Sequence, residues 1–262
     1  MRDLGARVLA GGVSGLDAAT ALLLRQHPLG PGAVGSTLRS ADESAQQAAV
    51  RLVSALGNSY LPIQGPPGTG KTYTGAEQIL ELIALGRTVG ITGPSHAVIH
   101  NLISAVLSHA AARNLAAPRV GQRADRDNPL LHPDARSLDY PKLVGGLAAG
   151  DLDVAAGTTW MWSRSDLRAS VDALFVDEAG QISLADVLAV SGAARNVMLL
   201  GDPQQLAQPS QAAHPPGSGV SGLEHILNGR ATMPPVAGLL IDKPWRMDPN
   251  ISSPRRPSTT AS

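Results

Sequence analysis

The chain has 262 residues, of which 43% are apolar, and its 21 Lys and Arg balance its 21 Asp and Glu. This composition excludes a disordered chain and an overall electrostatic footprint for nucleic acid or membranes, so a polyanionic partner must be held by a local surface. The absence of Cys excludes disulfides and thiolate chemistry, and the N-terminus lacks an apolar run long enough for a signal or a membrane span. We expect a cytoplasmic protein with no membrane partner.

The first part of the chain is predicted to contain a helix, a linker and a second helix. Residues 14–26 form the first helix, with Ser14 as its N-cap, and a Pro/Gly-rich linker follows. We expect residues 1–40 to be a helical extension with this linker. Residues 41–56 form the second helix, whose apolar stripe consists of Ala49, Val50, Leu52, Val53 and Leu56.

Short apolar runs separated by helical segments fill the middle of the chain. A helix is predicted from residue 71 to 85, ended by Gly86. Apolar runs without polar alternation indicate buried parallel strands, so the predicted fold class is α/β, with a parallel sheet and helices on both faces. The runs are "TVGITG" (88–93), "LDVAAG" (152–157), "ALFV" (173–176), "NVMLL" (196–200) and "GLLI" (238–241).

Residues 111–150 are less regular than the rest and are predicted to be an irregular, solvated insertion. Basic and acidic side chains alternate there, which is typical of a solvent-exposed segment rather than of a binding patch. The charged residues are Arg119, Arg123, Arg126, Arg136, Asp125, Asp127 and Asp134.

A phosphate-binding loop lies between a strand and a helix. Its glycines allow backbone N–H groups to converge on a polyphosphate at the helix N-terminus. Lys71 neutralises the β- and γ-phosphates, and the Thr72 hydroxyl binds Mg²⁺. Pro62 removes a ladder hydrogen bond from the preceding strand, so we expect a distorted strand or one that begins at Ile63. The loop residues are Gly65, Pro66, Pro67, Gly68, Thr69, Gly70, Lys71 and Thr72.

An acidic pair at the end of "ALFVDEAGQ" completes a hydrolytic site. Asp177 at the carboxyl end of an apolar strand can reach the Mg²⁺ shell, and Glu178 can orient and deprotonate the attacking water. Asp177 to Gly180 also fits the D-x-x-G of GTPases, but the guanine-reading N-K-x-D is absent. An oligomeric AAA+ ATPase is a further alternative, although the next strand runs into "LLGDPQQLAQPSQ" (199–211) instead of a polar sensor.

That segment, with "GITGPSHAVIHNL" (90–102) and "PWRMDP" (244–249), resembles superfamily 1 helicases of the RNA-surveillance and DNA-repair branch. "GKTYTGA", "GSGVSGLEHIL" and "WRM" are similar to the helicase half of bacterial proteins that fuse a RecB-like nuclease to such a helicase. The resemblance implies a RecA-like P-loop NTPase domain over residues 41–241, with ATP and Mg²⁺ as cofactors and single-stranded DNA or RNA as partner.

The resemblance also implies roles for single residues. Gln205 would contact the γ-phosphate, and Arg246 would act as an arginine finger from the second motor domain. Trp245 would face the adenine ring and Gln46 would read the adenine edge, with Ser44 and Gln47 as comparable candidates.

Polar residues at two further positions are expected to contact the nucleic-acid backbone. They are Ser95, His96 and Asn101, and in "GTTW" Thr158 and Thr159. Surface or capping roles are favoured for His96 and His100 over a metal site. Core or domain packing is favoured over base stacking for Trp160 and Trp162.

Residues 242–262 are expected to be the start of a missing second motor domain and a disordered tail, with Asp248 in place of the family's His. A separate polypeptide would then supply the second RecA-like domain or a nuclease. The alternative is a truncated, non-catalytic remnant that binds ATP or a partner only.

Overall fold

A parallel sheet forms the centre of the molecule in the computed structural model, which describes residues 17–124, 128, 130–204 and 219–242. The strand order is β4-β3-β5-β2-β6-β7-β1-β8, and every adjacent pair is parallel. The strands are β1 (Tyr60–Gln64), β2 (Val89–Thr92), β3 (Val120–Gln122), β4 (Arg136–Ser137), β5 (Val154–Ala156), β6 (Val171–Val176), β7 (Ala194–Gly201) and β8 (Leu239–Leu240).

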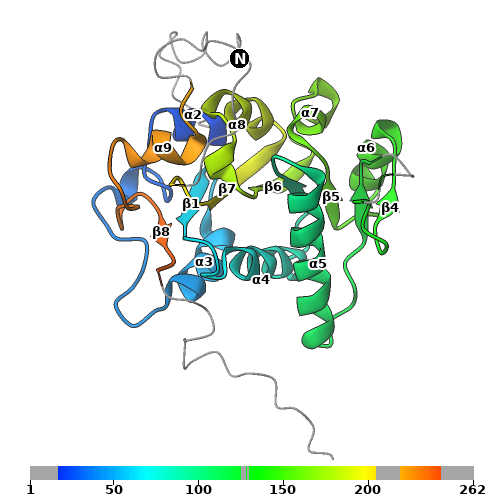
Figure 1. Ribbon diagram of the computed structural model, residues 1–262, viewed down its shortest axis with the longest axis horizontal. Helices are drawn as coiled ribbons and strands as arrows, with labels where there is room; N and C mark the ends of the chain where they lie inside the picture. Colours follow the sequence, from blue (N-terminus) through cyan, green and yellow to red (C-terminus); the bar gives the residue numbers. More distant parts are fainter. Residues whose placement is uncertain (1–16, 125–127, 129, 205–218, 243–262) are drawn as a thin grey trace, which may run out of the picture.

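Helices cover both faces of this sheet (Figure 1). The helices α3, α4 and α5 lie on one face, and α2, α8 and α9 lie on the other. The α-helices are α2 (Ala18–Leu23), α3 (Ala45–Ala55), α4 (Lys71–Ala84), α5 (His96–Ala112), α6 (Tyr140–Ala148), α7 (Thr159–Trp162), α8 (Leu184–Ser191) and α9 (Gly222–Leu227); the 3₁₀ turns are η1 (Pro31–Ala33), η2 (Ser165–Leu167) and η3 (Ala179–Gln181).

Two apolar cores, one on each face of the sheet, explain why the strands lack polar alternation. In β6, Leu174 and Val176 belong to the core under α8, whereas Ala173 and Phe175 belong to the core under α4 and α5. Side chains alternate between the faces of a strand, so a strand buried on both sides is apolar at every position. The predicted fold class is therefore confirmed.

The two N-terminal helices begin where a polar side chain caps them. Asp17 caps α2 by accepting a hydrogen bond of 2.9 Å from the backbone N–H of Thr20, and the expected N-cap Ser14 lies outside the described residues. Ser44 caps α3, whose first residue, Ala45, lies four residues after the predicted start at residue 41. The segment between these helices is tied to the sheet, because the Tyr60 hydroxyl donates to the Gln26 carbonyl over 2.8 Å.

Pro62 lies inside β1, so the predicted start of the strand at Ile63 is wrong. Successive residues of a parallel strand direct their backbone groups to opposite neighbours. The carbonyl of Ser59 and the N–H of Gly65 bond to β7, and the carbonyl of Gln64 bonds to Ile241 beyond β8. By this alternation Pro62 faces β8, whose pairing begins only at Ile63. The missing N–H therefore interrupts no ladder with β7.

The segment 111–150 is not the irregular insertion that its charges suggest. The strands β3 and β4 extend the sheet beyond β5, and α6 buries Leu143 and Leu147 in the core. Arg119 forms an ion pair with Asp153 over 2.6 Å. The pattern was hidden because strands of three and two residues give no apolar run, and because β3 contains Gly121, where a Cβ would lie 2.9 Å from Leu152.

Replacing Phe175 by Ala is expected to lower the free energy of unfolding by about 3–5 kcal/mol, because the ring is fully buried in the core between the sheet and α4. Urea unfolding followed by circular dichroism measures the change. Val34→Ala is the control, since this side chain is 75% exposed and its loss should change stability by less than about 0.5 kcal/mol. Equal effects of the two substitutions would contradict the assigned core.

Candidate nucleotide site

The carboxyl ends of the parallel strands place the chemistry-bearing segments along one edge of the sheet. Following the strand order from β5 through β2, β6 and β7 to β1, this edge carries Thr158, Ser95, Asp177, Asp202 and the loop that begins at Gly65. In open parallel sheets ligands bind at this edge. Segments that are more than 100 residues apart in the sequence therefore meet in one site.

The loop from residue 65 to 72 is closed by its own side chains. Lys71 is buried, and its ammonium donates to the carbonyls of Gly65 (2.7 Å) and Pro66 (3.3 Å). The Thr69 hydroxyl also donates to Pro66, over 2.8 Å. Gly70 precedes α4 with φ at +93° and offers no side-chain cap. The first N–H groups of a 14-residue helix therefore point into the loop without a capping acceptor, the arrangement that binds phosphate.

Asp177 is a buried carboxyl group at the end of β6. Its backbone N–H donates to the Thr92 carbonyl (2.9 Å), and its Oδ1 accepts from the N–H of Glu178 (3.0 Å). Burial, together with the negative charge of Glu178, raises the pKa of Asp177 to about 7, and the positive charge of Lys71 acts in the opposite direction. The loop cation and the acid at the strand end therefore belong to one electrostatic site.

Glu178 is held in a left-handed backbone conformation, with φ at +52° and ψ at +42°. This conformation costs a non-glycine residue on the order of 1 kcal/mol and is enriched at active sites, although Arg25, Asn58, Asn114, Ala169 and Asn228 also adopt it in this chain. Within the part of the chain that the structure describes, Oε2 of Glu178 is buried and has no hydrogen-bond partner. The carboxylate therefore has an acceptor that the described residues leave unused.

Gly180 and Asp202 were not predicted as site residues. The backbone of Gly180 lies against the Asp202 carbonyl so closely that a Cβ at this position would overlap the carbonyl oxygen. Asp202 is 6% exposed, and its Oδ1 accepts from the N–H of Gln204 over 3.0 Å. This close packing joins the end of β6 to the end of β7. Both residues lie in segments that the sequence singled out, "DEAGQ" and "GDPQQL". Only the structure shows that Gly180 and Asp202 contact each other.

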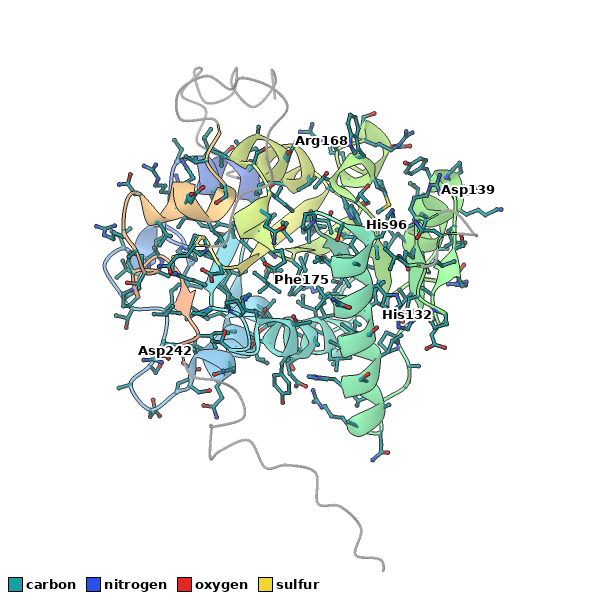
Figure 2. The ribbon with its side chains drawn as sticks, in the orientation of Figure 1. His96, His132, Asp139, Arg168, Phe175 and Asp242 are labelled. Carbon is teal, nitrogen blue, oxygen red and sulfur yellow. The ribbon has the colours of Figure 1, made fainter. Side chains whose placement is uncertain are left out.

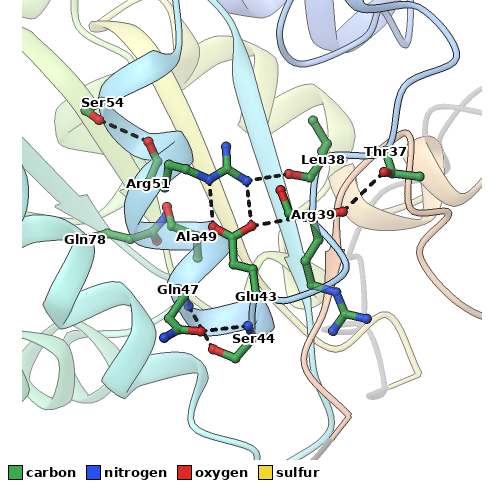
Figure 3. Close-up of polar contacts among 11 residues, drawn as sticks. Thr37, Leu38, Arg39, Glu43, Ser44, Gln47, Ala49, Arg51, Ser54 and Gln78 are labelled. Carbon is green, nitrogen blue, oxygen red and sulfur yellow. Dashed lines mark hydrogen bonds and ion pairs between the residues drawn. The ribbon is translucent and has the colours of Figure 1, made fainter.

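A cleft of about 600 Å³ lies between α3 and α4 and begins at the first turn of α4, with Tyr73 and Thr74. Ser44 and Gln47, two of the three candidates for reading adenine, form a capping box, with hydrogen bonds of 2.8 and 3.1 Å (Figure 3). Gln46 lines the cleft outside this box. Tyr73, which sequence reasoning missed, also lines it, and its ring meets the His109 ring edge-on at 4.5 Å.

The segments expected to contact nucleic acid lie on the same edge, at the ends of β2 and β5. The Ser95 hydroxyl caps α5 by accepting from the N–H of Val98 (3.3 Å), and His96 is the first residue of this helix (Figure 2). Asn101 is exposed further along α5. Thr158 and Thr159 begin α7. The N–H of Gly157 donates to the carbonyl of Ile91 over 3.1 Å, which joins the two strand ends.

The histidines of α5 make contacts with other side chains. In residues 17–124, 128, 130–204 and 219–242, no group of three or more His, Asp or Glu side chains is arranged to hold an ion. The His100 ring packs instead on the His132 ring, with centroids 4.8 Å apart. Burial, and the neighbouring His100, lower the pKa of His132.

The two tryptophans of α7 have opposite environments. Trp162 is 1% exposed, and its indole N–H donates to the Ile91 carbonyl over 3.0 Å, so it has the packing role that was predicted. Trp160 is 83% exposed and does not belong to the core. The expected core role is therefore confirmed for Trp162 and is wrong for Trp160.

Gln205, Trp245 and Arg246 lie outside the described residues, as does the segment 243–262. Their roles in the nucleotide cleft, and the start of a second motor domain beyond residue 242, stay predictions.

A phosphate-binding loop followed by a buried acid at a neighbouring strand end, on a parallel α/β sheet, defines a P-loop NTPase domain of RecA-like fold. The AAA domain family matches residues 42–214, and the chain belongs to this family. P-loop domains of this kind bind a nucleotide with a divalent metal.

The curated relatives are helicases. The chain is 28% identical over 184 residues to the DNA replication ATP-dependent helicase/nuclease DNA2 of Xenopus laevis, and 30% identical over 186 residues to that of Bos taurus. Each match covers 66% of this chain and 16% of the relative. Among solved structures, the arterivirus nonstructural protein 10 (helicase) in complex with DNA is 18% identical, with a TM-score of 0.43, over 74% of this chain and 37% of that one. The family and the curated relatives support a helicase-like P-loop domain.

The described residues contain no helix that is both long enough and apolar enough to cross a membrane.

Replacing Asp177 by Asn is expected to stabilise the metal-free protein at pH 8 and to have no effect near pH 4. The folded-state pKa is about 7 against an ordinary 3.8, so the folded state holds its proton more tightly and loses stability as the pH rises from about 4 to 7. The shift corresponds to at most ~4 kcal/mol above pH 7. Urea unfolding of both proteins in metal-free buffer at the two pH values measures the difference. A difference that is the same at both pH values would show that the carboxyl group is hydrated.

Proposed function

We propose that the chain is the ATP-binding and ATP-hydrolysing motor domain of a superfamily 1 helicase that acts on single-stranded nucleic acid. One observation carries the proposal. Lys71 and Asp177 lie within electrostatic reach of each other at one sheet edge, and Glu178 presents a buried, unpartnered carboxylate oxygen there. This combination supplies a phosphate cation, a metal ligand and a base at one place.

The residues of the loop and of β6 fit a magnesium nucleotide. Thr72 and Asp177 supply hard oxygen ligands, which Mg²⁺ prefers. When ATP is bound, Lys71 would exchange the carbonyls of Gly65 and Pro66 for phosphate oxygens, and the N–H groups at the start of α4 would contact the same phosphates. A Mg²⁺ ion held by these oxygens would supply positive charge to the transferred phosphoryl group.

Glu178 is the base in this proposal. Its Oε2 can accept a hydrogen bond from the attacking water, because the described residues leave that oxygen without a partner. The left-handed conformation of Glu178 and the packing of Gly180 against Asp202 fix the backbone that carries this side chain. Gln205 and Arg246 would complete the site on the γ-phosphate side.

The base of the nucleotide is expected to lie in the cleft between α3 and α4. Gln46 offers an amide that can both donate to and accept from an adenine edge, and Tyr73 offers an aromatic wall on the first turn of α4. Trp245 is expected to cover the opposite face of the adenine ring.

Coupling to a nucleic-acid strand is supported by the neighbouring strand ends. Ser95, Asn101, Thr158 and Thr159 present neutral polar groups that suit phosphate contacts and carry no base preference. His96 directly follows Ser95 as the first residue of α5. We expect a second RecA-like domain, in the same assembly or on a separate polypeptide, to close over the nucleotide, and a nuclease to be a further partner. Without that second domain, hydrolysis should be weak and unwinding absent.

Lys71→Ala and Glu178→Gln are expected to separate binding from turnover. Lys71→Ala should abolish ATP binding, because it removes the phosphate cation. Glu178→Gln should keep ATP affinity but lower turnover by about 100-fold or more, since it removes the base. Steady-state ATP hydrolysis with and without single-stranded DNA or RNA, together with binding of a fluorescent ATP analogue, measures both effects.

Asp134→Asn is the control for these variants, because it makes the same carboxylate-to-amide change at a side chain that is 75% exposed. Nucleic-acid-stimulated turnover that is lost in Glu178→Gln and kept in the control supports a motor domain. ATP binding without any turnover in the wild type favours a non-catalytic nucleotide-binding protein. Unchanged turnover in Lys71→Ala would falsify the site.

Gln46→Ala is expected to weaken ATP binding by about two- to tenfold, the loss of one or two hydrogen bonds, while leaving the affinity for inorganic tripolyphosphate unchanged. Isothermal titration calorimetry with both ligands separates the base from the phosphates. Gln26→Ala is the matched control, because its hydrogen bond to Tyr60 uses the backbone carbonyl. A parallel loss of tripolyphosphate affinity would place Gln46 in loop folding rather than in base recognition.

A further inference from the structure

Trp160 is the most exposed large apolar side chain of the described residues. It is 83% exposed, and the other exposed large apolar side chains in that part of the chain are all aliphatic. Exposing an indole to water gives up the hydrophobic stabilisation that its burial would provide. A bound group that covers the ring would restore that stabilisation.

The short helix α7, which carries Trp160, is held against the sheet by its two following residues. Met161 and Trp162, the next two residues, are each 1% exposed. Trp162 donates to the Ile91 carbonyl over 3.0 Å and packs over Gly90, where a Cβ would lie 2.8 Å from its ring. The backbone under the exposed indole is therefore fixed to β2. An aromatic platform held in place loses little conformational entropy when a planar ligand stacks on it.

The position of the indole on the sheet edge indicates the kind of ligand. Trp160 directly follows Thr158 and Thr159, and the end of β5 is hydrogen-bonded to the end of β2, which leads to Ser95. These are the segments assigned above to the strand backbone. If a phosphate of the strand lies at Thr158 and Thr159, we expect the base of that nucleotide to be close enough to contact the Trp160 ring.

Cationic and aromatic groups continue this surface toward α6. The guanidinium of Arg164 lies 4.3 Å from the centre of the Tyr140 ring, and that of Arg123 lies 5.2 Å from it. Arg164 also pairs with Asp166 over 2.9 Å, so its charge is partly balanced. Surfaces that bind single strands combine aromatic platforms with cations in this way.

We propose that Trp160 stacks on a base of the bound single strand and adds a base-dependent contact to the phosphate contacts of the neighbouring residues. The inference rests on the proposed nucleic-acid function. Because every base presents a π-face, stacking at Trp160 should be tolerant of sequence and should occur with both DNA and RNA.

Fluorescence anisotropy with labelled dT20, U20 and a fully abasic 20-mer tests the proposal on the full chain. Trp160→Ala is expected to weaken binding to dT20 and U20 by about tenfold, and Trp160→Phe to retain most of the affinity, because a ring remains. The abasic strand should bind the wild type and Trp160→Ala equally. Leu115→Ala, which removes another exposed apolar side chain beyond the far end of α5, is the control and should change nothing.

The outcomes distinguish this inference from the function on which it rests. A wild type that binds none of the strands overturns both. If the wild type and Trp160→Ala bind dT20 equally tightly, the stacking role is overturned and the motor function stands. An equal loss of dT20 and abasic-strand affinity in Trp160→Ala also overturns it, since the residue would then act on the backbone contacts or on folding; thermal unfolding of the variant tells these two apart.

Discussion

The parallel pairing of β1, β7 and β6 is the constraint on which the site depends. The carboxyl ends of parallel strands lie at the same edge of the sheet, so the segments that follow these strands lie close together there. The N–H of Gly65 donates to the carbonyl of Gly201 (3.1 Å), and Gly180 packs against the backbone of Asp202. β7 thereby fixes the loop on one side and the acidic pair on the other. A shift in either pairing would separate Lys71 from Asp177.

Three groups at the carboxyl edge of the sheet are in unfavourable or self-contained environments. Asp177 is buried with a raised pKa, Glu178 has a strained backbone and an unpartnered oxygen, and Lys71 bonds only to carbonyls of its own loop. Each of these groups would be better satisfied by a metal ion, a water or a phosphate. A stable core on both faces of the sheet makes this arrangement tolerable, because the marginal cost is small beside the burial of β6 and β7.

The helix α4, which follows the phosphate-binding loop, and the helix α5, which follows β2, are joined by side-chain contacts. Tyr73 in the cleft contacts His109, and Glu77 accepts from His109 (2.9 Å) and from Arg113 (2.8 Å). The hydrogen bond between His109 and Glu77 links α5 to α4. The same hydrogen bond lowers the pKa of Glu77. The helix that begins at Ser95 is thus packed rigidly against the helix that begins at Lys71.

The sequence by itself determined the fold class, the phosphate-binding loop and the acidic pair, because each depends on residues adjacent in the chain: apolar runs, glycines at fixed spacing, and acids at a strand end. The alternative that β1 begins at Ile63, after Pro62, is wrong, because the cost of a missing N–H depends on whether a neighbouring strand lies on that side. The irregular insertion expected at 111–150 is also wrong, because a strand of two residues is stabilised only by the strand beside it. Only the tertiary structure showed that Ser44 and Gln47 are engaged in a capping box while Gln46, which lines the same cleft, is outside it, and that Trp160 faces solvent while Trp162 is buried. Burial and hydrogen-bond partners are properties of distant contacts, and no local pattern encodes them.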